Sequence, residues 1–269
     1  MHQVLKNIMM SAICFLSYGK WQFRAAFDTI YQGQGKSHLF NEIVKDVFGN
    51  EYPEDAEPLS FVTLSDLNRM AGLMDLKSGN WFADIACGRG GPGMWIARKT
   101  GAGVKGVDIS SEAVTAAARR APEFGLGSRA VFSRGSFYAT GLEISSCDGA
   151  LSVDALWVVP DRDQALREAA RILKPGAKFV FTTWDGNIPF MPADHRKNLE
   201  DAGFRIDTYE ETPGWKERQL AVYEKVLESK DAFIREMGRA YAMPIIKEAK
   251  STPPVLEKST RILVSATKQ

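Results

Sequence analysis

A cluster of glycines beside an aspartate is the part of the chain whose residue types and spacing most clearly suggest chemistry. Asp84 precedes Gly88, Gly90 and Gly93 in the segment WFADIACGRGGPG at 81–93. Glycine lacks a Cβ atom, so the backbone here can turn tightly and approach a ligand closely. Free N–H groups at the start of the following helix would meet polar or anionic groups of that ligand. The segment predicts a strand, a ligand-binding turn and a helix.

A second carboxylate lies at the end of the next apolar run. Asp108 closes the segment VKGVD at 104–108 and follows Gly88 by twenty residues. An acidic side chain at this distance from a glycine-rich turn is placed to accept hydrogen bonds from ribose hydroxyls. The ligand is therefore expected to contain a nucleoside.

Asp84 distinguishes between two such ligands. A carboxylate in this place would repel the pyrophosphate of NAD, whereas it would attract the amino group and sulfonium of S-adenosylmethionine. The pattern therefore favours S-adenosylmethionine as the cofactor. Two plainer readings stay open: the glycines only pack a helix on a strand, and Asp84 only caps a neighbouring turn.

Short apolar runs alternate with amphipathic stretches along much of the chain. Helical spacing is present at Pro92–Thr100, Ser111–Ala121 and Arg162–Leu173, between strand candidates. This alternation predicts an α/β fold with a parallel, doubly wound sheet. The strand candidates are Trp81–Ile85, Val104–Val107, Ala130–Ser133, Cys147–Val153, Lys178–Thr183, Arg205–Glu210 and Arg261–Ala266.

Two helical regions frame this alternation. Residues 1–75 contain no strand candidate and are expected to form an N-terminal lid or extension, with a helix start near Thr63 or Ser65. Residues 76–269 are expected to form the cofactor-binding domain, with a helical cap inserted at about 213–255. Both helical regions should lie over one end of the sheet, where open α/β folds bind ligands.

Composition excludes several classes of protein. The 269 residues include 34 Lys and Arg and 33 Asp and Glu, so the chain has no strong overall field to attract nucleic acid. Cys14, Cys87 and Cys147 are widely spaced and suggest neither a disulfide framework nor a zinc cage. No metal site is expected, and a reducing cytoplasm fits best.

The apolar N-terminal segment Ile8–Tyr18 weakly resembles a secretory signal. It contains about eleven residues, fewer than the ~20 that span a bilayer, so no stable membrane span is expected. We interpret it as a partly buried or partner-facing helix, and a homo-oligomer would form through the N-terminal helices.

Five motifs follow one another along the chain: 84–93 (DIACGRGGPG), 106–110 (GVDIS), 135–137 (GSF), 148–157 (DGALSVDALW) and 170–179 (ARILKPGAKF). In this order they resemble the motifs of class I S-adenosylmethionine-dependent methyltransferases. The segment 54–63 (EDAEPLSFVT), the pair Thr183-Trp184 and the helical insertion at Trp215 further resemble a bacterial small-molecule subgroup, near the sterol and ubiquinone/menaquinone C-methyltransferases.

The resemblance implies a fold and a cofactor site. The sheet would have seven strands in the order 3-2-1-4-5-7-6, with strand 7 antiparallel. Asp84 and the turn Gly88–Gly93 would hold the methionine end of the cofactor. The other implied contacts are Asp108 with the ribose, Ile109, Ser136 and Phe137 with the adenine, Asp154 on the methyl-transfer face and Tyr31 against the cofactor carboxylate. The family usually has Asp at the position of Ser136, so this contact would come from the backbone.

Candidates for catalysis are few. His195 is the first choice for a general base, because its ring would face the pocket if it is not an exposed or capping residue. His38 lies in the presumed lid. Relatives often carry His where this chain has Trp157, which weakens the assumption of a shared base.

Aromatic residues are expected to bind the acceptor. Trp157 and Trp184 follow consecutive predicted strands and would position a flat or cationic acceptor, unless both belong to the core. Five residues of the cap would roof the acceptor or simply pack its helices: Trp215, Tyr223, Phe233, Met237 and Tyr241.

Together these features predict an S-adenosylmethionine-dependent methyltransferase with an apolar small-molecule acceptor, with O- or C-methylation favoured over N-methylation. A nicotinamide-dependent oxidoreductase shares the glycine turn and Asp108 but does not explain Asp84. A protein of the same fold that binds the cofactor without transferring methyl stays open. Nucleic-acid methylation is disfavoured, because the charge is neutral and an Asn/Asp-Pro-Pro-Tyr motif is missing after the fourth strand.

Overall fold

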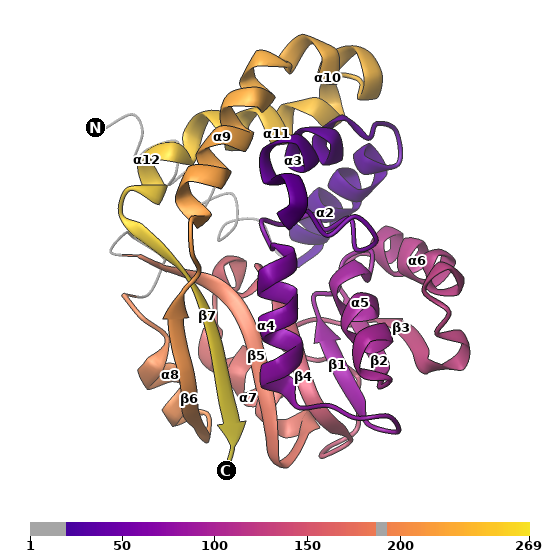
Figure 1. Cartoon of the computed structure of the whole chain (residues 1–269), viewed down its shortest axis with the longest axis vertical. Helices are drawn as coiled ribbons and strands as arrows, with labels where there is room; N and C mark the ends of the chain where they lie inside the picture. The colour runs from indigo at the N-terminus through magenta and orange to yellow at the C-terminus, as the bar shows by residue number, and fades with distance from the viewer. Residues whose placement is uncertain (1–19, 187–192) are drawn as a thin grey trace.

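A computed structural model of the chain describes residues 20–186 and 193–269, which form a seven-stranded sheet in the order β3-β2-β1-β4-β5-β7-β6 (Figure 1). The pairs from β3 to β5 are parallel, whereas β7 is antiparallel to both β5 and β6. This topology confirms the predicted order and the antiparallel seventh strand. The strands are β1 Trp81–Ile85, β2 Gly103–Asp108, β3 Ala130–Arg134, β4 Cys147–Val153, β5 Leu173–Gly186, β6 Phe204–Glu211 and β7 Ser259–Lys268.

The predicted strands differ most from the structure at β5. This strand begins at Leu173, directly after helix α7 (Arg162–Ile172), and not at Lys178. Lys174, Pro175 and Gly176 therefore lie within β5 and not in a separate turn. Leu173 already pairs with Cys147, and the register shifts between Cys147 and Gly149, so an irregular pairing extends the strand beyond its apolar part.

Helices cover both faces of the sheet and its upper end in Figure 1. The predicted segment Ile8–Tyr18 lies outside the described residues. The helices of the described residues are α2 Lys20–Gln34, α3 Leu39–Phe48, α4 Leu64–Met74, α5 Gly91–Thr100, α6 Ser111–Arg120, α7 Arg162–Ile172, α8 Arg196–Asp201, α9 Trp215–Glu228, α10 Lys230–Met237, α11 Arg239–Ser251 and α12 Pro253–Leu256.

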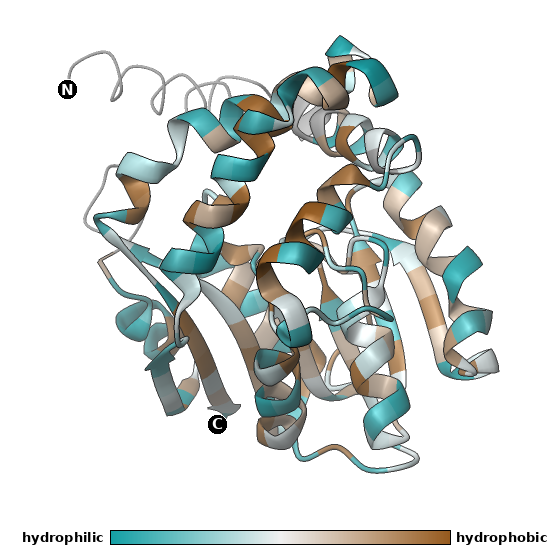
Figure 2. Ribbon diagram, turned by 45° about the horizontal axis from the view of Figure 1, so that its top comes forward, coloured by the Kyte–Doolittle hydropathy of each residue, from teal (hydrophilic) through white to brown (hydrophobic). Residues whose placement is uncertain are grey.

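Two apolar clusters hold the layers together. Side chains alternate along a strand, so Phe82 packs on the side of Met70 in α4, whereas Ala83 packs on the side of Leu166 in α7. The central strands are thus buried on both faces, as expected for parallel sheets. Figure 2 shows hydrophobic residues along the strands and hydrophilic residues spread over the surrounding helices.

Helix α4 belongs to the sheet layers, although it lies within the predicted N-terminal lid. It begins with a capping box, in which Thr63 Oγ1 accepts from the Asp66 backbone N–H and Asp66 Oδ2 accepts from that of Thr63. Its buried residues Leu67 and Met70 join the cluster on the sheet. The helices over the end of the sheet therefore come from residues before α4 and after β6.

Helices far apart in the sequence form this upper layer, which we call the cap: α3 with α9, α10, α11 and α12 (Figure 1). Their shared apolar cluster includes Val44 and Phe48 of α3 and Trp215, Val222 and Phe233 of the later helices. The predicted cap at 213–255 is helical in the structure, and its position over the sheet depends on contacts with α3.

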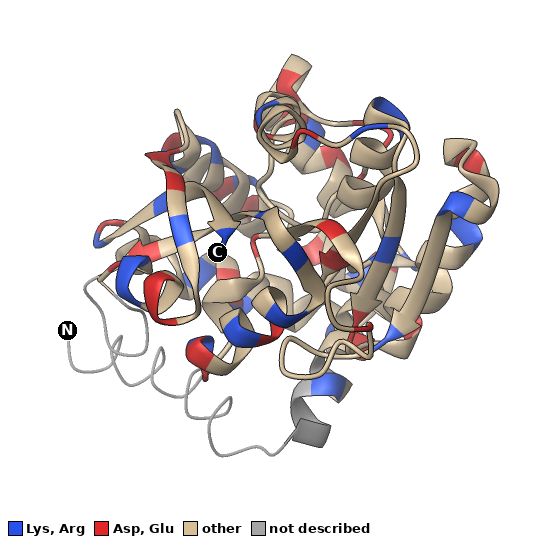
Figure 3. Ribbon diagram, turned by 90° about the horizontal axis from the view of Figure 1, so that it is seen from below, with Lys and Arg blue, Asp and Glu red and all other residues tan. Residues whose placement is uncertain are grey.

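Charges of both signs are intermixed along the ribbon in the view from below (Figure 3). Among the described residues, no helix is long and apolar enough to cross a membrane.

Candidate active site

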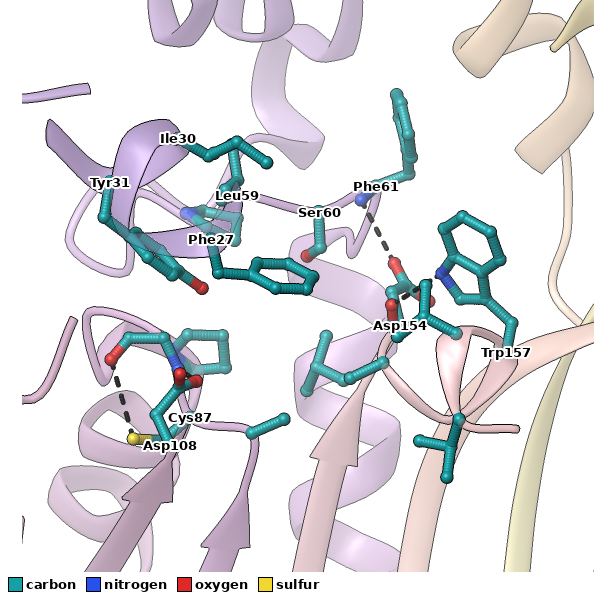
Figure 4. Close-up of a pocket in the computed structure, with 18 of the residues that line it drawn as sticks. Phe27, Ile30, Tyr31, Leu59, Ser60, Phe61, Cys87, Asp108, Asp154 and Trp157 are labelled. Carbon is teal, nitrogen blue, oxygen red and sulfur yellow. Dashed lines mark hydrogen bonds between the residues drawn. The ribbon is translucent and has the colours of Figure 1, made fainter. Parts of the chain in front are cut away.

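A cavity of about 580 Å³ lies between the carboxyl ends of the central strands and the helices above them. This volume falls within the range typical of small-molecule sites. In Figure 4, Tyr31 and Phe27 project from α2 on one side of the cavity, and Asp154 and Trp157 lie on the other. We call the part near Asp84 and Asp108 the glycine-turn end, and the part under α9 and α11 the cap end.

Asp84 is a buried carboxylate, and one of its two oxygens lacks a hydrogen-bond partner among the described residues. It is 2% exposed, lines the cavity, and its Oδ2 has no hydrogen-bond partner among the described residues. Burial, followed by the charge of Asp108, raises its pKa to about 7. A positively charged ligand would stabilise the ionised form of this side chain. The geometry therefore fits the sulfonium and amino group that the sequence predicts.

Asp108 is held firmly at the end of β2. Its Oδ2 accepts from the Gly88 backbone N–H at 2.8 Å, and its Oδ1 accepts from that of Ser110 at 2.9 Å. Burial raises its pKa, and these backbone hydrogen bonds oppose the rise. A carboxylate has about four acceptor positions, so this one can also accept hydrogen bonds from a diol.

The predicted glycines have two different roles. Gly88 lines the cavity, whereas Gly90 and Gly93 are absent from its lining. A Cβ atom on Gly93 would lie 2.3 Å from Asp84 Oδ2, and one on Gly90 would lie 2.9 Å from the Phe132 ring. Gly90 and Gly93 therefore shape the turn outside the lining, and their contact with a cofactor stays a prediction.

Gly91, within the predicted turn Gly88–Gly93, has a contact that the sequence analysis did not anticipate. It lines the cavity, and a Cβ atom there would lie 1.8 Å from the backbone oxygen of Ala56. The approach of the loop around Ala56 cannot be predicted from local sequence, because the two residues are 35 positions apart.

The predicted adenine residues lie together. Ile109, Ser136 and Phe137 line the cavity beside Asp108. The loop that carries Ser136 is fixed by a hydrogen bond from its backbone N–H to the oxygen of Ala139, at 3.0 Å. The departure from the usual Asp at position 136 leaves a hydroxyl, which accepts from the Tyr138 backbone N–H at 3.2 Å.

Tyr31 extends from α2 over the glycine turn. Its hydroxyl lies 2.7 Å from the position that a Cβ atom on Gly88 would occupy. Burial, followed by the nearby charge of Asp108, raises its pKa well above the usual value, so the phenol stays a neutral donor. Phe27 and Ile30 of the same helix also line the cavity, and the sequence analysis did not identify them as site residues.

Two tryptophans form an aromatic wall. The rings of Trp157 and Trp184 pack edge to face, with centroids 6.0 Å apart and planes at 79°. Both line the cavity, Trp157 is 41% exposed, and its Nε1 donates to the Asp154 backbone oxygen at 3.0 Å. Of the five aromatic and Met residues predicted to roof the acceptor, Tyr223 lines the cavity, whereas Trp215, Phe233 and Met237 are buried in the cap cluster.

Asp154 lines the cavity but is engaged by protein groups. Its carboxylate accepts from Arg261 Nε at 2.9 Å, from Arg261 Nη2 at 3.1 Å and from the Phe61 backbone N–H at 3.1 Å. Fully buried Arg261 also donates to Asp66 at 2.8 Å. Arg261 was missed because it is 107 residues from Asp154. Asp154 therefore fixes the shape of the cavity.

His195 does not line the cavity, which corrects the prediction that its ring faces the pocket. The side chain is fully buried behind β5, where Nε2 lies 3.4 Å from the Trp184 backbone oxygen. Burial lowers its pKa to about 4. Its backbone N–H donates to Tyr209 Oη at 2.9 Å. His38 starts helix α3 and is also absent from the lining.

Comparison with known families agrees with this geometry. Residues 83–181 match the family model of a methyltransferase domain, Methyltransf_11. This match confirms the predicted resemblance for the part of the chain from β1 to β5.

Curated relatives of the chain include methyltransferases of natural products. It is 32% identical over 128 residues to the methyltransferase GfsG of Streptomyces halstedii, covering 48% of this chain and 46% of that protein. It is 31% identical over 133 residues to the 27-O-demethylrifamycin SV methyltransferase of Amycolatopsis mediterranei, covering 48% and 47%. Sterol C-methyltransferases match as well. The chain thus spans about half the length of the first two relatives.

Solved structures share the fold. The [4+2]-cyclase SpnF superposes with a TM-score of 0.67 at 22% identity, covering 75% of this chain and 79% of that one. The fold is therefore the Rossmann-like fold of S-adenosylmethionine-dependent methyltransferases.

Proposed function

We propose that this chain is an S-adenosylmethionine-dependent methyltransferase that acts on an apolar small molecule by O- or C-methylation. The observation that carries the proposal is buried Asp84, a residue of the cavity lining near the charge of Asp108, with one carboxylate oxygen that has no hydrogen-bond partner among the described residues. A cationic ligand would offset the cost of these buried carboxylates, whereas the pyrophosphate of NAD would increase it.

The described residues fit this cofactor. Asp84 and the Tyr31 hydroxyl would bind its amino acid end, Asp108 its ribose, and Ile109 and Phe137 its adenine. The cofactor supplies a methyl group that its positive sulfur already activates. The protein's task is then to hold the acceptor in line and to exclude water, and such positioning can contribute roughly 7 to 11 kcal/mol at the favourable extreme.

Among the residues that the structure describes, no histidine lines the cavity. His195 is buried outside it, and the ionisable side chains at the cap end are Tyr223 and Glu248. The names of the relatives support O- and C-methylation of natural products and sterols. We infer that the acceptor reaches the aromatic wall of Trp157 and Trp184, where a flat apolar molecule would lose little by leaving water.

An acceptor screen tests this proposal. The protein is incubated with S-adenosylmethionine and apolar phenols, activated carbon acids or amines of similar size, and S-adenosylhomocysteine is quantified by mass spectrometry. We expect product with phenols or carbon acids and little with amines. Tight cofactor binding without turnover of any acceptor would favour the non-methylating alternative, and turnover of amines alone would contradict the proposed atom class.

A further inference from the structure

The cap end of the cavity contains a row of three polar side chains. Gln219 and Tyr223 lie one turn apart on α9, and Glu248 lies on α11. Gln219 Nε2 donates to Tyr223 Oη at 2.8 Å, and Tyr223 Oη donates to Glu248 Oε1 at 2.8 Å. All three residues line the cavity. The row therefore ends on a carboxylate at the site where the acceptor is proposed to bind.

The row has unused acceptor capacity. Tyrosine has one hydroxyl proton, and here it is directed to Glu248. Within the described residues, no hydrogen bond reaches the second oxygen, Oε2, of Glu248, and Oε1 of Gln219 has no partner. Glu248 lines the cavity and is an exposed residue, so a ligand donor can reach its carboxylate.

The described residues place no cation at this end of the cavity. Arg89 is the one basic side chain among the described lining residues, and it lies 3.7 Å from Glu57 near the glycine turn. Asp154 is already paired with Arg261. Within the described part of the chain, Glu248 is thus a lining carboxylate without a cationic partner, and an anionic acceptor would lie beside it without compensation.

We propose that the acceptor is an apolar molecule that carries an O–H or N–H donor and no anionic group, and that Glu248 binds this donor. Tyr223 and Gln219 are positioning residues, because they fix the carboxylate without needing to contact the acceptor. This inference rests on the proposed function and narrows its substrate class. It excludes phosphorylated and carboxylated acceptors.

The test compares four naphthalenes of nearly equal size, each titrated calorimetrically into protein saturated with S-adenosylhomocysteine. The probes are 2-naphthol, 2-(aminomethyl)naphthalene as its ammonium form, 2-methoxynaphthalene and 2-naphthoate. We expect 2-naphthol and the ammonium probe to bind about 10-fold or more tightly than the methyl ether, because each can donate a hydrogen bond to a charged group. The carboxylate probe is expected to bind most weakly.

Variants assign the preference to Glu248. We expect Glu248→Leu to abolish the advantage of both donors, and Glu248→Gln to abolish that of the ammonium probe while keeping part of that of 2-naphthol. Tyr223→Phe should reduce the preference by a smaller factor. The matched control Glu224→Gln changes an exposed side chain next to Tyr223 on α9 and should leave all four affinities unchanged.

Several results would overturn the inference. They are equal binding of naphthol and its methyl ether, tight binding of naphthoate, no measurable binding of either donor, and an unchanged preference in a folded Glu248→Leu protein. A purely structural row would lower the melting temperature of these variants without changing probe selectivity. Failure of S-adenosylhomocysteine to bind at all would instead reject the proposed function, so the two failures are distinguishable.

Discussion

Asp84 has opposite effects on stability and on binding. Its pKa is raised to about 7 in the folded protein, above the value of 3.8 for an unperturbed aspartate. A raised carboxyl pKa means that the folded protein binds a proton more tightly than the unfolded chain, so stability falls as pH rises from about 3.8 through about 7. The affinity for a cationic ligand instead rises with pH, because only the ionised form of Asp84 attracts a cation.

Asp84→Asn therefore separates the two effects. We expect the ligand-free variant to be more stable than the wild type at pH 8 by up to a few kcal/mol, because each unit of pKa shift corresponds to about 1.4 kcal/mol. The same variant should bind S-adenosylmethionine at least about 10-fold more weakly, since the cation loses its partner. Thermal unfolding at pH 5 and 8, together with calorimetry, measures both, and a variant destabilised at pH 8 would contradict this account.

Gly91 is the glycine whose replacement should be most disruptive. A Cβ atom would lie 1.8 Å from the backbone oxygen of Ala56, and backbone cannot move aside as easily as a side chain. We expect Gly91→Ala to lower stability by about 1 to 3 kcal/mol or more through overpacking. Gly72→Ala is the matched control: nothing lies within 4 Å of its added Cβ inside α4, so it should stabilise the helix by roughly 0.5 to 1 kcal/mol. Equal melting temperatures for the two variants would refute the close approach.

At the scale of elements, Arg261 joins three of them. It extends from β7 to Asp66 in α4 and to Asp154 after β4, and it has no exposed surface. The contact explains how Asp154 is held in the left-handed region, with φ at 51°. The position of Asp154, three residues before Trp157, therefore depends on strand β7.

We expect Arg261→Met to destabilise the protein by about 3 to 5 kcal/mol, because two buried carboxylates lose their partner. Arg69→Met, which removes an exposed ion pair with Glu210, should cost at most about 1 kcal/mol. Urea unfolding of both variants gives the comparison. A similarly small loss of unfolding free energy in both variants would show that the buried network around Arg261 contributes little to stability.

Particular residues show what the sequence predicts and what it does not. β1 and β4 agree with prediction to the residue, because each is a short, mostly buried run bounded by turns. The predicted cofactor residues Asp84, Asp108 and Ile109 come from local motifs and the family resemblance, and they lie together at one cavity. His195 was predicted wrongly, because its ring direction depends on packing between β5 and β6. Arg261 and Glu248 depend on contacts between distant elements, for which local spacing gives no signal.

At the scale of the whole molecule, two helical segments close the cavity. In sequence, α2 precedes the first strand, and α9 to α12 come between β6 and β7. The two segments cover different ends of the cavity: α2 contributes Phe27 and Tyr31 near Asp108, and α9 and α11 contribute Tyr223 and Glu248. We therefore expect the cofactor and the acceptor to contact different helices.

Hydrogen exchange can resolve this division. We expect S-adenosylhomocysteine to slow amide exchange in α2 and at the glycine turn, with a smaller effect in α9 and α11. Addition of 2-naphthol should then slow exchange in α9 and α11. Protection by S-adenosylhomocysteine confined to the cap helices would contradict the assignment of the two ends.

The central claim is that Asp84 and Asp108 form a site for S-adenosylmethionine, and calorimetric titration tests it most directly. The ligands are S-adenosylmethionine, S-adenosylhomocysteine and NADH, measured against the wild type, Asp108→Asn and the exposed control Asp231→Asn. We predict that the first two ligands bind the wild type and the control equally well, bind Asp108→Asn at least about 10-fold more weakly, and that NADH does not bind. Binding of NADH alone, or unchanged affinity in Asp108→Asn, would contradict the account.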